Sequence, residues 1–172
     1  MNRNSLRPLG LRLLAAGLLA ASLGACSVAG LSTHGNSRLQ VAEVNDIGSY
    51  TADSALVQAR AHFRNNDFGH SAAFYKRLVE LSPKNPEGYV GLGASYDRMR
   101  RFDLSDRIYA SLFAISGGTA QYYNNVGYSY LLRGKLKDAM SNFRKAQSLA
   151  PDSVVIANNI QLVTQATATA RI

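Results

Sequence analysis

Two histidines and a lone cysteine are the side chains of this sequence with the clearest chemical potential. His62 and His70 stand eight positions apart, and an imidazole can transfer a proton near neutral pH or bind a metal ion. The eleven acidic residues are scattered and mostly lie beside Arg or Lys. The sequence contains neither the Gly-x-Ser-x-Gly turn of serine hydrolases nor a Gly-x-x-x-x-Gly-Lys phosphate loop, and one cysteine excludes a multi-cysteine zinc site. We therefore predict no enzymatic activity, no catalytic residue, no metal site and no small-molecule substrate.

The cysteine offers a different chemistry, because its thiolate can accept a lipid. Three arginines in the first twelve positions precede an apolar run over residues 13–23, which is too short to span a bilayer as a helix. This order predicts a cleaved signal peptide over residues 1–25. Leu23-Gly24-Ala25-Cys26 resembles the bacterial lipobox, which implies that Cys26 carries covalent lipid, the one non-protein group expected, and becomes the first residue of the mature chain. The alternative is cleavage after Ala25 that leaves a free thiol.

Once the signal peptide is removed, the charge of the chain is modest. Nineteen basic and eleven acidic residues give the whole chain a net charge of +8, a value that favours nucleic-acid binding. Three of the basic residues belong to the signal peptide, which leaves a net charge of +5. Hydrophobic residues make up 47% and charged residues 17%, against about 25% charged in an average soluble chain. The mature chain can therefore bury a core, and we expect no nucleic-acid partner.

Residues 27–51 are rich in Gly, Ser, Thr and Asn and show no sustained apolar period, which predicts a flexible linker with a root-mean-square span of roughly 25–30 Å. A short strand or helix around Leu39–Val44 is the alternative, which no pattern in the sequence supports.

From residue 52 onward the chain repeats itself with a period of about 34 residues, which resembles the period of the tetratricopeptide repeat, a pair of antiparallel helices. The copies are residues 52–85, 86–119 and 120–153. The third copy is the most regular, with Tyr123, Val126, Gly127 and Tyr130 in its first helix and Phe143 in its second. In the first copy, His62 takes the column that tyrosine holds in the others, which favours a core role.

These repeats predict an all-α fold, a right-handed α-α superhelix of three repeats closed by a capping helix within residues 154–172. We expect helices near 53–66, 69–82, 86–99, 103–115, 119–132 and 136–149, and a seventh that ends near 167. Asp103 and Thr119 are predicted N-caps, and Gly134 is predicted at a turn that needs a positive φ. Gly93 and Gly127 are expected where two helices cross closely.

The first helix of each repeat lines the concave face in this architecture. The stripe of that helix that does not pack against other helices is the predicted partner-binding groove. Its residues are Asp53, Leu56, Arg60, Arg64, Glu87, Val90, Ala94, Asp97, Arg98, Gln121, Asn124, Tyr128 and Leu132, with Asn125 at the edge. Asparagine amides can hold a peptide backbone by donating and accepting at once, although Asn124 and Asn125 can equally serve only to solvate this face. The stripe lacks the ring of Lys, Asn and Arg with which similar domains clamp a C-terminal carboxylate, so a chaperone-tail receptor is not expected.

Basic residues gather at two turns one repeat apart, and they predict a solvated convex stripe or, as a minority interpretation, a contact with anionic headgroups or an acidic partner. They are Arg98, Arg100, Arg101, Arg133, Lys135 and Lys137.

A signal peptide, lipobox, short linker, three repeats and a capping helix together resemble the TadD family of tight-adherence (Flp) pilus assembly lipoproteins. The segment from Asn124 to Gly134, NNVGYSYLLRG, looks like theirs. The resemblance implies a non-enzymatic outer-membrane lipoprotein on the periplasmic face that acts as a pilotin or adaptor for a secretin. Ser27 in place of aspartate agrees with the outer membrane. Two alternatives stay open: a lipoprotein of another envelope machine, such as type IV pilus or outer-membrane protein assembly, and a scaffold that recruits peptidoglycan enzymes.

Overall fold

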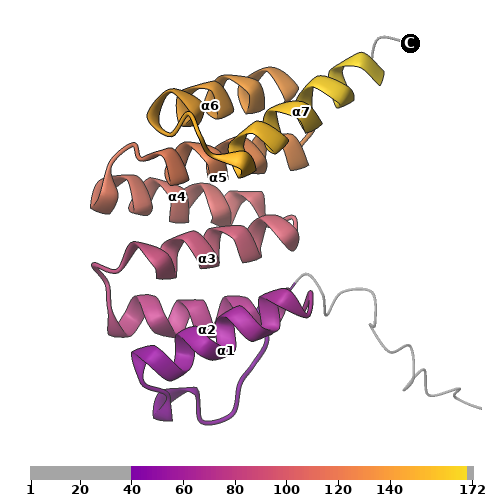
Figure 1. Cartoon of the computed structure of the whole chain (residues 1–172). Coiled ribbons are helices and arrows are strands. Elements are labelled where there is room, and N and C mark those ends of the chain that lie inside the picture. Colours follow the sequence, from indigo (N-terminus) through magenta and orange to yellow (C-terminus); the bar gives the residue numbers. More distant parts are fainter. Residues whose placement is uncertain (1–39, 170–172) are drawn as a thin grey trace, which may run out of the picture. The chain divides into compact units, whose positions relative to one another are not determined.

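The computed structural model describes residues 40–169, and the predicted signal peptide, the lipidation site Cys26 and the first part of the linker lie outside this range. The described part is all-α, as predicted, with helices stacked in antiparallel pairs (Figure 1). Its elements are the short 3-10 helix η2 (Ile47–Ser49) and the α-helices α1 (Ala52–Arg64), α2 (Phe68–Leu81), α3 (Pro86–Arg98), α4 (Phe102–Ser116), α5 (Ala120–Leu132), α6 (Leu136–Leu149) and α7 (Val154–Thr169). Every predicted helix is present, with ends that differ by at most two positions.

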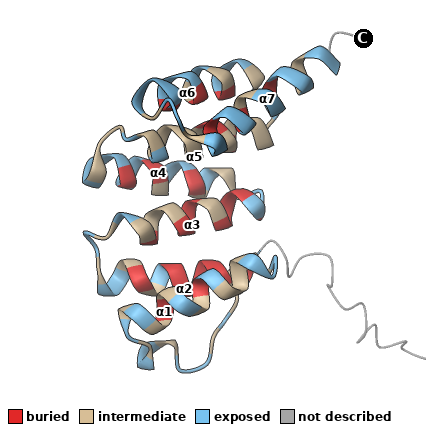
Figure 2. Cartoon of the chain, in the orientation of Figure 1, coloured by how far each residue is buried: buried red, intermediate tan, exposed pale blue. Residues whose placement is uncertain are grey.

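The pairs α1–α2, α3–α4 and α5–α6 follow the three predicted repeats, and α7 stacks against α6 at the end of the stack (Figure 1). Buried residues lie along the sides of the helices that face one another (Figure 2). One core cluster joins the first two repeats around Phe74, Leu78 and Met99. A second lies between α6 and its neighbours around Phe143 and Val163. No helix within residues 40–169 is long and apolar enough to cross a membrane.

Glycines allow the two helices of a repeat to approach closely, as predicted. A Cβ on Gly93 would lie 2.6 Å from the Tyr109 ring, and one on Gly127 would lie 2.8 Å from the Phe143 ring. Both distances are far shorter than a normal carbon–carbon contact of about 3.5–4.0 Å, so the ring of the second helix occupies the space of the missing side chain.

The turn inside each repeat uses one left-handed residue at a fixed place in the frame. Gly134 has φ 72°, as predicted, and the equivalent residues of the second and first copies are Arg100 and Asn66, each with φ 58°. Glycine adopts this conformation at no steric cost, whereas an arginine does so at a cost of about 1–2 kcal/mol. The second repeat therefore carries local strain that the third avoids.

The predicted N-caps had different outcomes. Thr119 caps α5, since its side-chain oxygen accepts a hydrogen bond from the backbone N–H of Tyr122 at 3.1 Å. The prediction for Asp103 is wrong, because α4 begins at Phe102 and places Asp103 inside the first turn. There the carboxylate still complements the positive end of the helix dipole.

The predicted linker is wrong over residues 40–51, which pack against the first repeat. Val41, Val44, Ile47 and Tyr50 contact the core cluster of the first two repeats. The backbone N–H of Ala42 donates to the carbonyl of Gly69 at 3.1 Å, and Arg77 donates to the carbonyl of Gly48 at 2.8 Å. Burial of apolar side chains together with satisfied backbone groups fixes this segment on α2 in spite of its polar composition.

Candidate functional site

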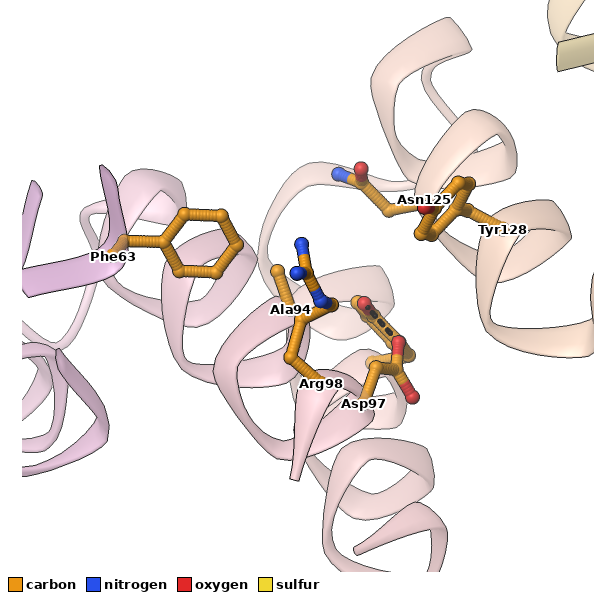
Figure 3. A pocket seen from close by; sticks show the side chains of 7 residues that line it. Phe63, Ala94, Asp97, Arg98, Asn125 and Tyr128 are labelled. Carbon is orange, nitrogen blue, oxygen red and sulfur yellow. Dashed lines mark hydrogen bonds between the residues drawn. The ribbon is translucent and has the colours of Figure 1, made fainter. Parts of the chain in front are cut away.

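A cavity of about 320 Å³ opens between the first helices of the three repeats. Figure 3 shows Phe63 entering it from α1, Ala94, Asp97 and Arg98 from α3, and Asn125 and Tyr128 from α5; Tyr109 of α4 completes the wall. The repeat explains this convergence, because Phe63 and Asp97 hold equivalent positions in successive copies, as do Ala94 and Tyr128. Equivalent positions on successive parallel helices meet on one face of the stack.

Two nitrogen donors face this cavity. The side-chain amide nitrogen of Asn125 is buried and has no hydrogen-bond partner, and in Figure 3 the amide extends toward the space between Phe63 and Arg98. A buried unpaired donor costs about 1–3 kcal/mol, which a bound oxygen acceptor would recover. The guanidinium of Arg98 lies 4.4 Å from the centre of the Phe68 ring and donates to Asn66 Oδ1 at 3.3 Å. The cavity thus offers a cation and an amide donor beside aromatic surface.

Asp97 also lines the cavity, but its carboxylate already accepts hydrogen bonds from other side chains of the protein. Its residue surface is only 3% exposed, and its oxygens accept hydrogen bonds from the hydroxyls of Tyr109 at 2.8 Å and Ser129 at 2.6 Å. Burial raises the pKa of Asp97 above its usual range, and these hydrogen bonds, together with that of Ser105, offset part of the effect. The carboxylate ties α3 to α4 and α5, so the prediction of a free groove side chain is wrong for this residue.

Arg133 extends the same network and is not a free charge of the convex stripe. It donates to Ser129 Oγ at 2.7 Å and forms a two-pronged ion pair with Asp106, one arm of which is 2.9 Å long. Hydrogen bonding to Asp106 raises the pKa of Arg133. Arg98, predicted on both faces, lies at the cavity. For Arg98 and Arg133, the prediction of a solvated convex stripe is therefore wrong.

Several other predicted groove residues have partners inside the chain. Arg60 of α1 forms an ion pair with Glu87 of α3. Asn124 accepts a hydrogen bond from the amide of Asn159 in α7 at 2.8 Å, so the seventh helix occupies that side chain. These contacts join successive first helices to one another and to the capping helix.

Five of the predicted groove residues line the cavity, namely Ala94, Asp97, Arg98, Asn125 and Tyr128. The others lie outside it: Asp53, Arg64 and Gln121 are exposed, and Leu56, Val90 and Leu132 are half-buried. Two lining residues, Phe63 and Tyr109, were missed. The position of Phe63 could have been found by moving one repeat back from Asp97. Tyr109 reaches the cavity from a second helix, which the stripe did not include.

Comparisons with known proteins agree with the repeat architecture. Residues 120–153, the predicted third repeat, match the family model described as tetratricopeptide repeat. The mouse RNA polymerase II-associated protein 3 is 24% identical over 139 residues, covering 78% of this chain and 21% of that protein. The chain therefore spans about a fifth of the length of the curated relatives it matches.

Solved structures share the fold at low sequence identity. The first such repeat domain of human RPAP3 has a TM-score of 0.59 and 19% identity, covering 69% of this chain and 96% of that one. The Yersinia enterocolitica type III secretion chaperone SycD, in complex with a peptide of the translocator YopD, has a TM-score of 0.56 and 18% identity, covering 70% and 98%. Scaffolds of this kind are typically non-catalytic.

Proposed function

Because residues 120–153 match the tetratricopeptide repeat and the described part of the chain shares the fold of such domains, we propose that the protein is a non-enzymatic adaptor that holds a segment of a partner protein in the cavity between α1, α3 and α5. The observation that carries this proposal is the buried, unpartnered amide of Asn125 at a cavity that also contains Arg98. Such an amide favours a ligand that brings an oxygen acceptor.

The lining defines the chemistry of the bound segment. Asn125 and Arg98 suit a backbone carbonyl or a carboxylate, since both are donors. Phe63, Ala94 and Tyr128 provide apolar and aromatic surface for a side chain of the same segment. A volume of about 320 Å³ is at the lower end for ligand pockets, which fits one or two residues of a peptide. The SycD complex, in which a protein of this fold holds a translocator peptide, supports this mode of binding.

We further propose that the adaptor works in the bacterial envelope, as an outer-membrane lipoprotein that serves the Flp pilus secretin. This part rests on the lipobox at Cys26 and on the resemblance to the TadD family. The rival settings are another envelope machine and the recruitment of peptidoglycan enzymes.

Site-specific photo-crosslinking of the full chain in cells tests the proposal. A photoreactive phenylalanine analogue replaces Tyr128 at the cavity or, as a matched control, Phe113, which is 47% exposed on α4. We expect capture of a secretin subunit from position 128 only, and weaker capture when Arg98→Ala is added. Capture of a different envelope protein at position 128 would refute the secretin assignment, and equal capture from both positions would refute the groove.

The membrane anchor needs a separate test. Cys26→Ser removes the thiol that the lipid requires, so we expect the chain to leave the membrane fraction. Continued membrane association of Cys26→Ser would count against lipidation.

A further inference from the structure

A cluster of three potential metal ligands lies at the turn between α1 and α2, and none of the three lines the proposed peptide cavity. Asp67 Oδ2 is 3.0 Å from Nδ1 of His62 and 2.8 Å from Nδ1 of His70. The two imidazole rings are stacked, with centroids 5.0 Å apart and planes 20° from parallel. Within residues 40–169, these three side chains are the group whose ligand atoms all lie within 4.8 Å of one another.

The repeat supplies an internal comparison for this cluster. The positions equivalent to His62, Asp67 and His70 carry Tyr96, Arg101 and Leu104 in the second copy and Tyr130, Lys135 and Asp138 in the third. Packing of the repeat thus needs an aromatic ring at the first position, which His62 supplies by stacking on Phe74 at 5.5 Å. The packing does not require that this ring be an imidazole, and it does not require an aspartate and a histidine at the other two positions. Only the first copy places all three together.

From this geometry we propose that His62, Asp67 and His70 bind a divalent transition-metal ion of the zinc class through their two Nδ1 atoms and one carboxylate oxygen. Two imidazoles and a carboxylate are ligands that Zn²⁺ accepts, with bonds of about 2.0–2.2 Å. Tetrahedral bonds of that length separate ligand atoms by about 3.3 Å. The two distances from Asp67 Oδ2 need to lengthen by only a few tenths of an ångström, and the two imidazole nitrogens lie within 4.8 Å of each other. On binding, the metal takes the place of the Nδ1 hydrogens that face the carboxylate: a neutral imidazole keeps its one hydrogen by carrying it on Nε2, and an imidazolium releases one proton.

The surroundings leave the site accessible and suit a fourth ligand from water. The side chains of His62, Asp67 and His70 are 28%, 41% and 42% exposed. Asp67 and His70 also line a second cavity of about 880 Å³, together with Glu43 from the N-terminal segment. Arg98 and Arg100 line this cavity as well; the guanidinium of Arg98 is turned onto the Phe68 ring. The bound metal would join the end of α1 to the start of α2.

Calorimetric titration of the purified, chelator-treated full chain with ZnSO₄ tests this site. We expect one Zn²⁺ per chain, and a thermal midpoint that rises by about 5–10 °C when free Zn²⁺ is about 100 times the dissociation constant. Co²⁺ in the same site should show the visible absorption of a low-coordinate complex.

Three variants separate metal binding from folding. His62→Tyr restores the residue of the other two copies, Asp67→Asn keeps a side chain able to cap α2, and His34→Ala changes the one histidine outside the cluster. We expect the affinity for Zn²⁺ to fall at least about tenfold in the first two variants, with unchanged far-ultraviolet circular dichroism, and to stay unchanged in His34→Ala. The absence of Zn²⁺ binding to the unaltered chain, or equal binding in all variants, would overturn the proposal.

Discussion

Tyr109→Phe tests whether the buried carboxylate of Asp97 holds the middle of the stack together. The Tyr109 hydroxyl donates to Asp97 Oδ2 at 2.8 Å, and the two residues are 4% and 3% exposed. The substitution removes only this hydroxyl. The ring should keep its place, because Phe143 occupies the equivalent position of the third copy and packs against Gly127 as Tyr109 packs against Gly93.

The expected loss of stability depends on the hydrogen bonds that the Asp97 carboxylate retains in the variant. A hydrogen bond to a charged group contributes about 1.5–3 kcal/mol. Ser129 still donates to the carboxylate at 2.6 Å, and water from the adjoining cavity can reach it. We therefore expect the free energy of unfolding to fall by an amount in the lower part of that range, about 1.5–2 kcal/mol.

Equilibrium unfolding of the full chain in urea at pH 7, followed by circular dichroism, measures this cost. With a slope of about 2 kcal/mol per molar urea, the midpoint should fall by nearly 1 M. The matched control is Tyr89→Phe, which removes a hydroxyl that donates to the Pro83 carbonyl at 2.9 Å in an exposed position. That change should stay within about 0.5 kcal/mol. If the two variants lose the same stability, the network around Asp97 does not support the stack as argued.

Three further predictions concern single positions. Because burial raises the pKa of Asp97 in the folded chain, the folded state binds a proton at Asp97 at a higher pH than the unfolded state does. Between pH 7 and about 4, acidification should therefore stabilise the unaltered chain relative to Asp97→Asn. A difference between their free energies of unfolding that stays constant with pH would contradict this. Arg100→Gly should raise the free energy of unfolding by about 0.5–1 kcal/mol, since it relieves a φ of 58° at some cost in chain entropy; a loss of stability would refute the strain. Gly91→Ala should lower the free energy of unfolding by about 3 kcal/mol, because the new Cβ would overlap the Tyr75 ring. Its control is Gly48→Ala, where no atom lies within 4 Å of the new Cβ, so the thermal midpoint should change little. Similar midpoints for the two variants would count against the close packing at Gly91.

The helices were predictable from the sequence because the repeat period and the small residues at helix crossings express the same packing rule. Gly93 and Gly127 indicate the close approach before any coordinate is known. The left-handed turn was also predictable at Gly134, because glycine favours a positive φ. It was not predictable at Arg100, because the repeat imposes a positive φ there on a residue type that does not indicate one.

The site was predictable only in part, since a repeat frame tells which face a side chain takes and not which neighbour covers it. Asn124 and Asn125 are adjacent and chemically identical, yet Asn124 is bonded to Asn159 of α7 while the amide nitrogen of Asn125 has no partner. Asp97 looked like a free charge because its partners Tyr109 and Ser129 lie 12 and 32 positions away. The segment 40–51 was missed because its few apolar residues stand among polar ones and follow neither the i, i+3, i+4, i+7 pattern of an amphipathic helix nor the alternation of a strand.

The packing of residues 40–51 on α2 limits how far the proposed lipid anchor could stand from the folded domain. With lipid on Cys26, as proposed, only the chain between Cys26 and Gln40 separates the membrane from the folded part. The thirteen residues between them reach at most about 50 Å even when fully extended. If the proposed lipid anchor forms, the start of the folded part therefore stays within about 50 Å of the bilayer, so a partner would have to present its segment close to the membrane.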